Sequence, residues 1–258
     1  EEQVITGDDG YNLSKVTIKA VTKDIDENIQ SGNIKAGVSI LGVEGVLEGN
    51  KLPDVLNKTV TSLTAGDLIG VTQIPNYAFQ NCIDLASVEF SSILQTIGSY
   101  AFYGCRSLTS IDFGENSQLT SIGTSAFNNC RGLTSINLSN CTNLTSIGSS
   151  AFSDCRGLTS ITFPSSLGTI GDYAFYRCEG LTSITLPSSL TSIGAYAFRS
   201  CTSLTTMRVE ATTPPTLSTT NAISTATTRI EVPMASVDAY KAATNWSNFA
   251  DIIVGYTE

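Results

Sequence analysis

The stretch that decides the fold is IGSSAFSDCRGLTSITFPSSLGT, which runs from Ile147 to Thr169. Its Ala-Phe pair, with a Cys three residues after the Phe, occurs six times, at spacings of 23, 25, 25, 23 and 23 residues. The six Phe residues are Phe79, Phe102, Phe127, Phe152, Phe175 and Phe198. A repeat of about 20–29 residues is typical of a leucine-rich solenoid, in which a unit buries its apolar face only against its neighbours. We therefore predict a stack of repeats and expect binding rather than catalysis.

Each repeat contains an alternating segment that predicts a strand. In the quoted repeat Leu158, Ile161 and Phe163 are apolar, and the polar Ser160 and Thr162 flank the Ile. This alternation indicates a strand with one buried face. The equivalent segments are Leu85–Phe90, Leu108–Phe113, Leu133–Leu138, Leu181–Leu186 and Leu204–Val209. Stacked at ~4.8 Å, these strands form a parallel sheet along one side of the solenoid.

The segment Gly148–Cys155 predicts a short helical turn. The position of its Gly is occupied by Pro75 in the first repeat, and proline is favoured at the first position of a helix. A Gly that superimposes on Pro75 needs no positive φ, so we interpret it as a close-packing residue. The predicted fold class is an α/β-type solenoid: a leucine-rich repeat stack with a parallel β-sheet on the concave side, short helical turns on the other side, and a cap at each end.

Four parts are predicted along the chain. Residues 1–50 lack the repeat and form a small N-terminal module, and residues 51–73 are a transition that serves as the N-terminal cap. Residues 74–210 hold the six leucine-rich repeats. Residues 211–258 break the pattern with Thr-Thr-Pro-Pro and form the C-terminal cap. A solenoid needs such caps because its open ends are apolar.

Composition excludes several classes of function. The 258 residues carry a net charge of −9, which disfavours nucleic acid and anionic membranes as partners. No run of 18 apolar residues is present, so no membrane span is predicted. The chain has no His, which removes Ser-His and Cys-His catalysis and most zinc chemistry. We predict a protein that is not an enzyme, with no catalytic residue, no metal and no cofactor.

The pattern IG-xx-AF-xx-C-xx-L-xx-I-x-(L/F)-PSSL over residues 74–210 resembles the BspA-like leucine-rich repeats of bacterial and protist surface proteins. The tail, with TTPPTL, Arg229–Pro233, Val237–Lys241 and Trp246, resembles the usual terminus of that family. The resemblance implies a strand, a short helix and a closing strand over the last repeat. It also implies a secreted or surface-attached domain for adhesion, whose partner is an extracellular protein or a glycan.

The first part of the chain carries a second resemblance. The segments SKVTIKAV and IDENIQSGNIKAGVSILGVEGVLEG are similar to a small module found in tail and surface proteins of phages of Gram-positive and gut bacteria. This similarity implies an alternative function, an attachment or receptor-binding component of a phage or phage-like tail, located on the virion. The oligomeric state is left open.

Seven cysteines are present, and six of them share one repeat position: Cys82, Cys105, Cys130, Cys155, Cys178 and Cys201. Disulfides between equivalent positions would break the repeat geometry, so we interpret the six as buried free thiols, with disulfides or a metal as the alternative. Cys141 lies in a two-residue insertion between a strand and the next Leu. We expect it to be the most exposed thiol.

The outward positions of the predicted strands give the candidate binding residues. One file is Ser87, Ser110, Ser135, Ser160, Ser183 and Thr206. The second file is Glu89, Asp112, Asn137, Thr162, Thr185 and Arg208, which runs from acidic to basic. Hydroxyl and amide groups suit hydrogen bonding to a polar ligand, so we predict that Asp112, Asn137, Thr162 and Thr185, called the polar file below, are the central contacts. The alternative is a polar sheet surface without a ligand, since small hydroxyls seldom dominate binding energy.

Two other sets of side chains recur at fixed repeat positions. Arg106, Arg131 and Arg156, called the arginine stripe below, follow the Cys of three consecutive repeats. They form either a competing site for an anion or acidic partner, or a solvated face that Asp154 neutralises in part. A second set precedes Ala-Phe in four repeats, namely Tyr77, Tyr100, Tyr173 and Tyr196. We expect these tyrosines to be partly buried on the helical side.

Overall fold

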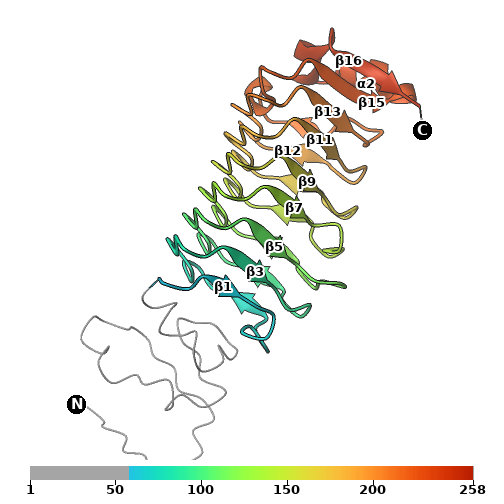
Figure 1. The fold of residues 1–258 in the computed structure, drawn as a ribbon. Coiled ribbons are helices and arrows are strands. Elements are labelled where there is room, and N and C mark those ends of the chain that lie inside the picture. Colours follow the sequence, from blue (N-terminus) through green and yellow to red (C-terminus); the bar gives the residue numbers. More distant parts are fainter. Residues whose placement is uncertain (1–57, 258) are drawn as a thin grey trace, which may run out of the picture.

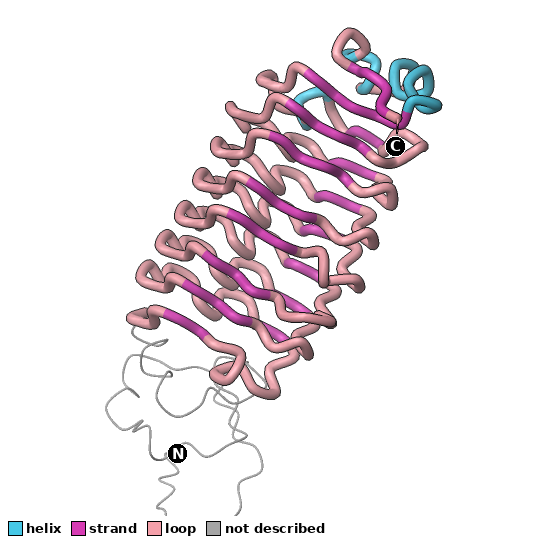
Figure 2. Tube along the Cα trace, turned by 45° about the vertical axis from the view of Figure 1, so that its right-hand side comes forward, coloured by secondary structure: helices cyan, strands magenta, loops and turns pink. Residues whose placement is uncertain are grey.

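The structure, a computed structural model, describes residues 58–257. In this range the chain winds into an elongated stack of coils that is nearly straight in both views (Figures 1 and 2). The stack is therefore described below by its strands and turns rather than by a concave side. The predicted module at residues 1–50, with its similarity to phage proteins, lies outside the described residues, and so do residues 51–57 of the transition at 51–73.

One side of each coil contributes a strand to the surface called the long-strand face. Its strands are β1 (Ser62–Leu63), β3 (Ser87–Glu89), β5 (Ser110–Asp112), β7 (Ser135–Asn137), β9 (Ser160–Thr162), β11 (Ser183–Leu186), β13 (Thr206–Val209), β15 (Arg229–Pro233) and β16 (Ile253–Tyr256). All paired neighbours are parallel, in the groups β1-β3-β5, β7-β9 and β11-β13-β15-β16, and the groups follow one another along the stack. The strands predicted from alternation are confirmed in their central residues.

A second parallel sheet lies on another side of the coils, and it was not predicted. Figure 2 shows its short strands behind those of the long-strand face. They are β2 (Gln73–Ile74), β4 (Thr96–Ile97), β6 (Ser121–Ile122), β8 (Ser146–Ile147), β10 (Thr169–Ile170), β12 (Ser192–Ile193) and β14 (Thr216–Leu217). Each strand has two residues, with the second one buried. Two residues are too few to show a period of two, which explains why alternation did not reveal this sheet.

The predicted helical turns are wrong, because the segments before each Cys are stacked β-turns. In the fourth repeat the Ser153 N–H donates to the Ser150 carbonyl, at 3.1 Å, which closes a turn. The N–H of Phe152 instead donates to Ala174 in the next coil, at 2.8 Å. The residue before Ala-Phe has a φ of 54–64° in all six repeats, and the residue before each Cys is also left-handed. A right-handed helix cannot contain such residues, and bonds between coils replace its internal hydrogen bonds.

Helices are therefore few in the described part of the chain. Residues 58–257 contain one α-helix, α2 (Val237–Ala242), and three 3₁₀ segments, η3 (Thr220–Ala222), η4 (Met234–Ser236) and η5 (Trp246–Phe249). The architecture is a parallel-stranded β-solenoid rather than an α/β one. Among these helices none is long and apolar enough to cross a bilayer.

The glycine that opens each turn is confirmed as a close-packing residue. Gly148 has no positive φ, and a Cβ placed on it would lie 2.7 Å from the carbonyl carbon of Gly123 and 2.7 Å from the oxygen of Ile122. These atoms are backbone of the preceding coil, so they cannot move aside as a flexible side chain can. The close approach of the coils is what requires glycine here.

Replacing Gly148 with Ala is expected to lower the free energy of unfolding by ~1–3 kcal/mol, because the added methyl overpacks the contact between coils. Gly168→Ala is the matched control, since a Cβ there meets nothing closer than 3.6 Å and φ is not positive. The control should leave stability unchanged or raise it by ~0.4–1 kcal/mol. Urea unfolding followed by circular dichroism measures both, and equal midpoints for the two variants would contradict the packing argument.

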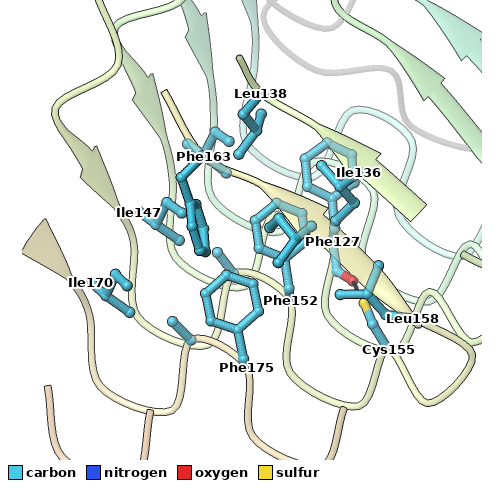
Figure 3. Packing of buried hydrophobic residues seen from close by; sticks show 14 of the residues in the cluster. Phe127, Ile136, Leu138, Ile147, Phe152, Cys155, Leu158, Phe163, Ile170 and Phe175 are labelled. Carbon is cyan, nitrogen blue, oxygen red and sulfur yellow. Dashed lines mark hydrogen bonds between the residues drawn. The ribbon is translucent and has the colours of Figure 1, made fainter. Parts of the chain in front are cut away.

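The core is a column of the six repeat phenylalanines. Neighbouring rings lie 5.0–5.5 Å apart between centroids and within 11° of parallel. Figure 3 shows Phe127, Phe152 and Phe175 in this column, with Ile147 and Ile170 of the short strands beside it. Phe163, from the end of a long strand, packs edge-on against Phe175, with centroids 5.8 Å apart. The side chains of all six column residues are fully buried, so the predicted internal column is confirmed.

The C-terminal end of the stack is covered by β15, α2 and β16 (Figure 1). Two large aromatic residues fix this arrangement. The hydroxyl of the buried Tyr240 donates to the Ala211 carbonyl, and the indole N–H of the buried Trp246 donates to the Pro215 carbonyl, both at 2.7 Å. The two rings meet edge to face at 5.1 Å. The last coil therefore packs on aromatic side chains instead of facing water.

Candidate binding surface

The long-strand face presents the polar file as the sequence predicts. Asp112, Asn137, Thr162 and Thr185 are all exposed, and they lie on the successive strands β5, β7, β9 and β11. Strand register aligns Glu89 with Asp112, Asn137 with Thr162, and Thr185 with Arg208. The outward residues thus form one file along the stack, about one strand spacing apart (~4.8 Å).

Two members of the polar file also hold their own loops. The N–H of Gly114 donates to Oδ1 of Asp112 at 2.8 Å, and the N–H of Ser139 donates to Oδ1 of Asn137 at 3.1 Å. Asp and Asn commonly stabilise turns in this way. The Asp112 carboxylate and the Asn137 amide are therefore oriented by the fold, and Oδ1 of each already accepts a hydrogen bond from its own loop.

At the basic end of the outward file, Arg208 is paired with a carboxylate of the C-terminal cap. The guanidinium of Arg208 lies 3.9 Å from Oε2 of Glu231, and its central carbon stands 3.7 Å from the ring centroid of Tyr256. Glu231 also pairs with Arg229 at 2.7 Å. The partners of Arg208 lie beyond the repeats, which is why the repeat pattern could not reveal them. The face therefore has an acidic N-terminal end, at Glu89, and a neutral centre.

The arginine stripe does not consist of equivalent cations. Arg156 lies 3.0 Å from Asp154 and 3.7 Å from Glu179, and Arg177 bridges the same two carboxylates at 3.6 and 3.7 Å. This four-residue network bears out the expected neutralisation by Asp154. Arg131 donates to the side-chain oxygen of the adjacent Asn129, at 2.7 Å. The side chain of Arg106 is exposed and has no ion pair or hydrogen bond to residues 58–257.

The cysteines are free and buried, and each repeat thiol from the second repeat onward has a defined acceptor. The Cys155 thiol donates to the Phe127 carbonyl at 3.2 Å (Figure 3). The same bond, at 3.1–3.2 Å, is made by Cys105, Cys130, Cys178 and Cys201. Burial raises the pKa of Cys82 to about 11 and that of Cys155 to about 12. The interpretation as free thiols is confirmed, and the weak S–H donor explains why this position is Cys and not Ala.

The expectation that Cys141 is the most exposed thiol is wrong, because its side chain is fully buried. The inserted loop does not leave the stack. The Cys141 N–H donates to Leu138 and its carbonyl accepts from Leu144, both at 2.9 Å, so two consecutive turns direct the side chain inward. Burial raises the pKa of this thiol as well. An insertion that contains a small apolar residue can extend the core instead of bulging outward.

A native thiol assay is expected to find no fast-reacting group, because all seven cysteines are buried and none is bonded to another. After denaturation without reductant the same assay should find seven thiols. Ellman's reagent with and without guanidinium chloride measures both values. A denatured count below seven would show that some of these thiols are oxidised.

The four turn tyrosines are exposed or half-buried, not enclosed. Tyr77 stacks on Tyr100 with centroids 5.1 Å apart, and Tyr173 stacks on Tyr196 at 4.8 Å. Sequence reasoning placed them on a helical side that does not exist, and it gave no sign that they pair. Among residues 58–257, no group of three or more His, Cys, Asp or Glu is arranged to hold a metal ion.

Comparisons with known proteins agree with the repeat pattern. The model of the BspA type leucine rich repeat region matches residues 57–153 and 140–231, in six copies. Among solved structures, a leucine-rich repeat protein of T. pallidum is 30% identical, with a TM-score of 0.50, over 54% of this chain and 65% of that one. A leucine-rich cell surface protein of Faecalibacterium prausnitzii is 23% identical, with a TM-score of 0.43, over 65% and 60% of the two chains.

The chain thus spans less than two thirds of the length of either of these proteins. No curated protein matches it. The family assignment depends on the repeats themselves, because the family model covers well over half of the sequence and includes all six repeats that build the core. The chain belongs to the family of BspA-type leucine-rich repeat proteins.

Proposed function

We propose that this chain is a non-catalytic extracellular binding or adhesion domain that recognises a protein or a glycan through its repeat surface. It acts at the cell surface or in secreted form. The observation that carries the proposal is the long-strand face, where an exposed file of carboxylate, amide and hydroxyl groups is fixed on successive parallel strands. Because the strands already hold these groups in place, binding costs little conformational entropy.

The centre of the polar file is the proposed contact. Thr162 and Thr185 are exposed on adjacent strands, and neither side chain makes a hydrogen bond within the described part of the chain. Their hydroxyls are available to a ligand, whereas Asp112 and Asn137 divide their capacity between a ligand and their own loops. The neutral centre and the acidic end favour a polar partner over a large apolar one. The arginine stripe remains the competing site, through Arg106 and Arg131.

Replacing Thr162 with Arg is expected to weaken binding more than tenfold, because a long cation in the middle of the file blocks contacts on both sides. The fold should tolerate the change, since Arg208 occupies the same file two strands further on. The probe is an array of immobilised extracellular-matrix proteins and glycans, exposed to the full chain. A melting curve equal to that of the unchanged protein controls for folding.

The matched comparison replaces Arg106, Arg131 and Arg156 with Ala. This variant should bind as the unchanged protein does if the polar file is the site. Normal binding by the Thr162→Arg variant, together with loss of binding by the arginine variant, would move the site to the stripe. Alanine at Asp112 or Asn137 is a poorer probe, since it also removes a loop hydrogen bond worth ~1 kcal/mol.

A further inference from the structure

The turn tyrosines are held in a strained backbone conformation. Tyr77, Tyr100, Tyr173 and Tyr196 have φ of 55–64°. For a bulky side chain a left-handed φ is a true outlier and costs about 1–2 kcal/mol. The third and fourth repeats carry Ser at the same position and the same φ. The coil therefore does not require tyrosine, and strain of this kind is typical of functional positions.

The tyrosines form two groups along the turns. The N-terminal tyrosine cluster comprises Tyr77, Tyr100 and Tyr103, with Tyr103 at 5.8 Å from Tyr100. The C-terminal tyrosine cluster comprises Tyr173, Tyr176 and Tyr196, with Tyr176 at 5.6 Å from Tyr173. The two clusters repeat the same arrangement, a stacked pair with a third ring beside it. Tyrosines supply large, rigid contact area with a hydrogen-bonding hydroxyl.

A gap of three coil steps separates the two clusters. In the core the corresponding steps measure 5.1–5.5 Å between Phe centroids. Tyr77 covers one face of Tyr100, and Tyr196 covers one face of Tyr173, so the other face of each ring is directed toward the gap. Tyr173 is 39% exposed. Ser125 and Ser150 occupy the same turn position within the gap, where Ser125 is buried and Ser150 is half-buried, so short side chains form the floor of the gap.

The gap and the C-terminal tyrosine cluster expose no aliphatic side chain, whereas the first described coils, which hold Tyr77, also expose Ile69, Ile83 and Ile93. Between residues 98 and 202 the single large hydrophobic side chain that is exposed is Tyr173. Asn128 and Ser153 occupy the positions of Tyr103 and Tyr176 within the gap; Ser153 is buried, and the exposed hydroxyls there belong to Thr124 and Ser149. In the gap and at the C-terminal tyrosine cluster, a protein partner would find no aliphatic side chain to pack against. A sugar fits better, because its C–H face stacks on an aromatic ring while its hydroxyls bond to amide and hydroxyl groups.

We propose that the two tyrosine clusters form a binding site for a neutral, extended polysaccharide that lies along the stack. The coil step is close to the length that one residue adds to an extended β-linked glycan, so one chain can reach both clusters. The net charge of −9 disfavours a polyanionic glycan. Occupying two clusters at once raises affinity by avidity. This site lies on the turns, so its test is independent of the long-strand face.

The test is affinity electrophoresis of the full chain in gels that contain neutral soluble polysaccharides, namely β-glucan, xylan, glucomannan and galactan. At least one should retard the unchanged protein. The double variant Tyr100→Ser and Tyr173→Ser should bind at least tenfold more weakly, because both ring faces at the gap are lost. Its melting temperature should not fall, since Ser occupies this φ in two natural repeats. Lys241→Ala, an exposed change on α2 that belongs to neither candidate surface, should leave the retardation unchanged.

A length series of oligosaccharides from the retarding polysaccharide tests the two-cluster geometry by calorimetry. Oligomers long enough to reach both clusters should bind at least tenfold more tightly than shorter ones. In the double variant this dependence on length should vanish. Absence of retardation by every polysaccharide, or equal retardation of the double variant and the unchanged protein, would overturn the proposal.

Discussion

Replacing Phe152 with Ala is expected to lower the free energy of unfolding by ~3–5 kcal/mol. The ring is fully buried in the middle of the phenylalanine column, with Phe127 at 5.4 Å on one side and Phe175 at 5.5 Å on the other. Neighbouring coils hold the two flanking rings in place, so the cavity cannot collapse and both rings lose a stacking partner. Urea unfolding followed by circular dichroism measures the change.

The matched control is Phe163→Leu. Phe163 is also buried and contacts the column at its edge, but Leu138 and Leu186 occupy its position in other repeats. A change that the repeat already tolerates should cost less than ~1.5 kcal/mol. If Phe152→Ala cost no more than this control, the column would not be the element that holds the coils together.

Replacing Trp246 with Ala is expected to cost a similar ~3–5 kcal/mol, and to act from one end of the molecule. The change removes the largest buried side chain of the C-terminal end, leaves the Pro215 carbonyl without its donor, and exposes Tyr240. Because coils contact only their neighbours, unfolding should begin at the uncovered end. Hydrogen exchange should then rise first in β15 and β16, and only later in β7 and β9.

Trp246→Phe separates the two contributions of this residue. The smaller ring retains most of the packing but cannot donate to Pro215. It should therefore lose less stability than Trp246→Ala and keep the order of exchange along the stack. Uniform loss of protection in all coils of the Ala variant would contradict a stack whose coils are stabilised by their neighbours.

The features that repeat in register could be predicted from the sequence. Alternation around Ile161 gives both the strand and its outward Thr162, because side chains in a strand have a period of two. The Phe column follows from one residue type that recurs every 23 or 25 residues. These two signals are sufficient to place the polar file, since stacking strands puts equivalent side chains side by side.

The features that depend on the neighbouring coil could not be predicted. The turn before Cys155 resembles a short helix in isolation, and only the bond from Phe152 to Ala174 shows why its N–H groups need no helical partner. The extra length of its segment favours an exposed Cys141, but the length of an insertion does not determine whether its side chains point into the core or toward solvent. The ion pair of Arg208 could not be predicted from the repeats, because its partner Glu231 comes after the last repeat.

The hydrogen bonds from thiols to the preceding coil also affect how the number of repeats can change during evolution. A disulfide framework commits each cysteine to one partner, so adding or losing a unit leaves an odd cysteine that must find another. Here each repeat thiol from the second repeat onward donates to the backbone of the coil before it, and the bond is the same in each of these coils. Recombination can therefore insert or delete whole coils without any re-pairing. Because the cysteines are buried and free, folding of the stack requires no disulfide-forming enzyme.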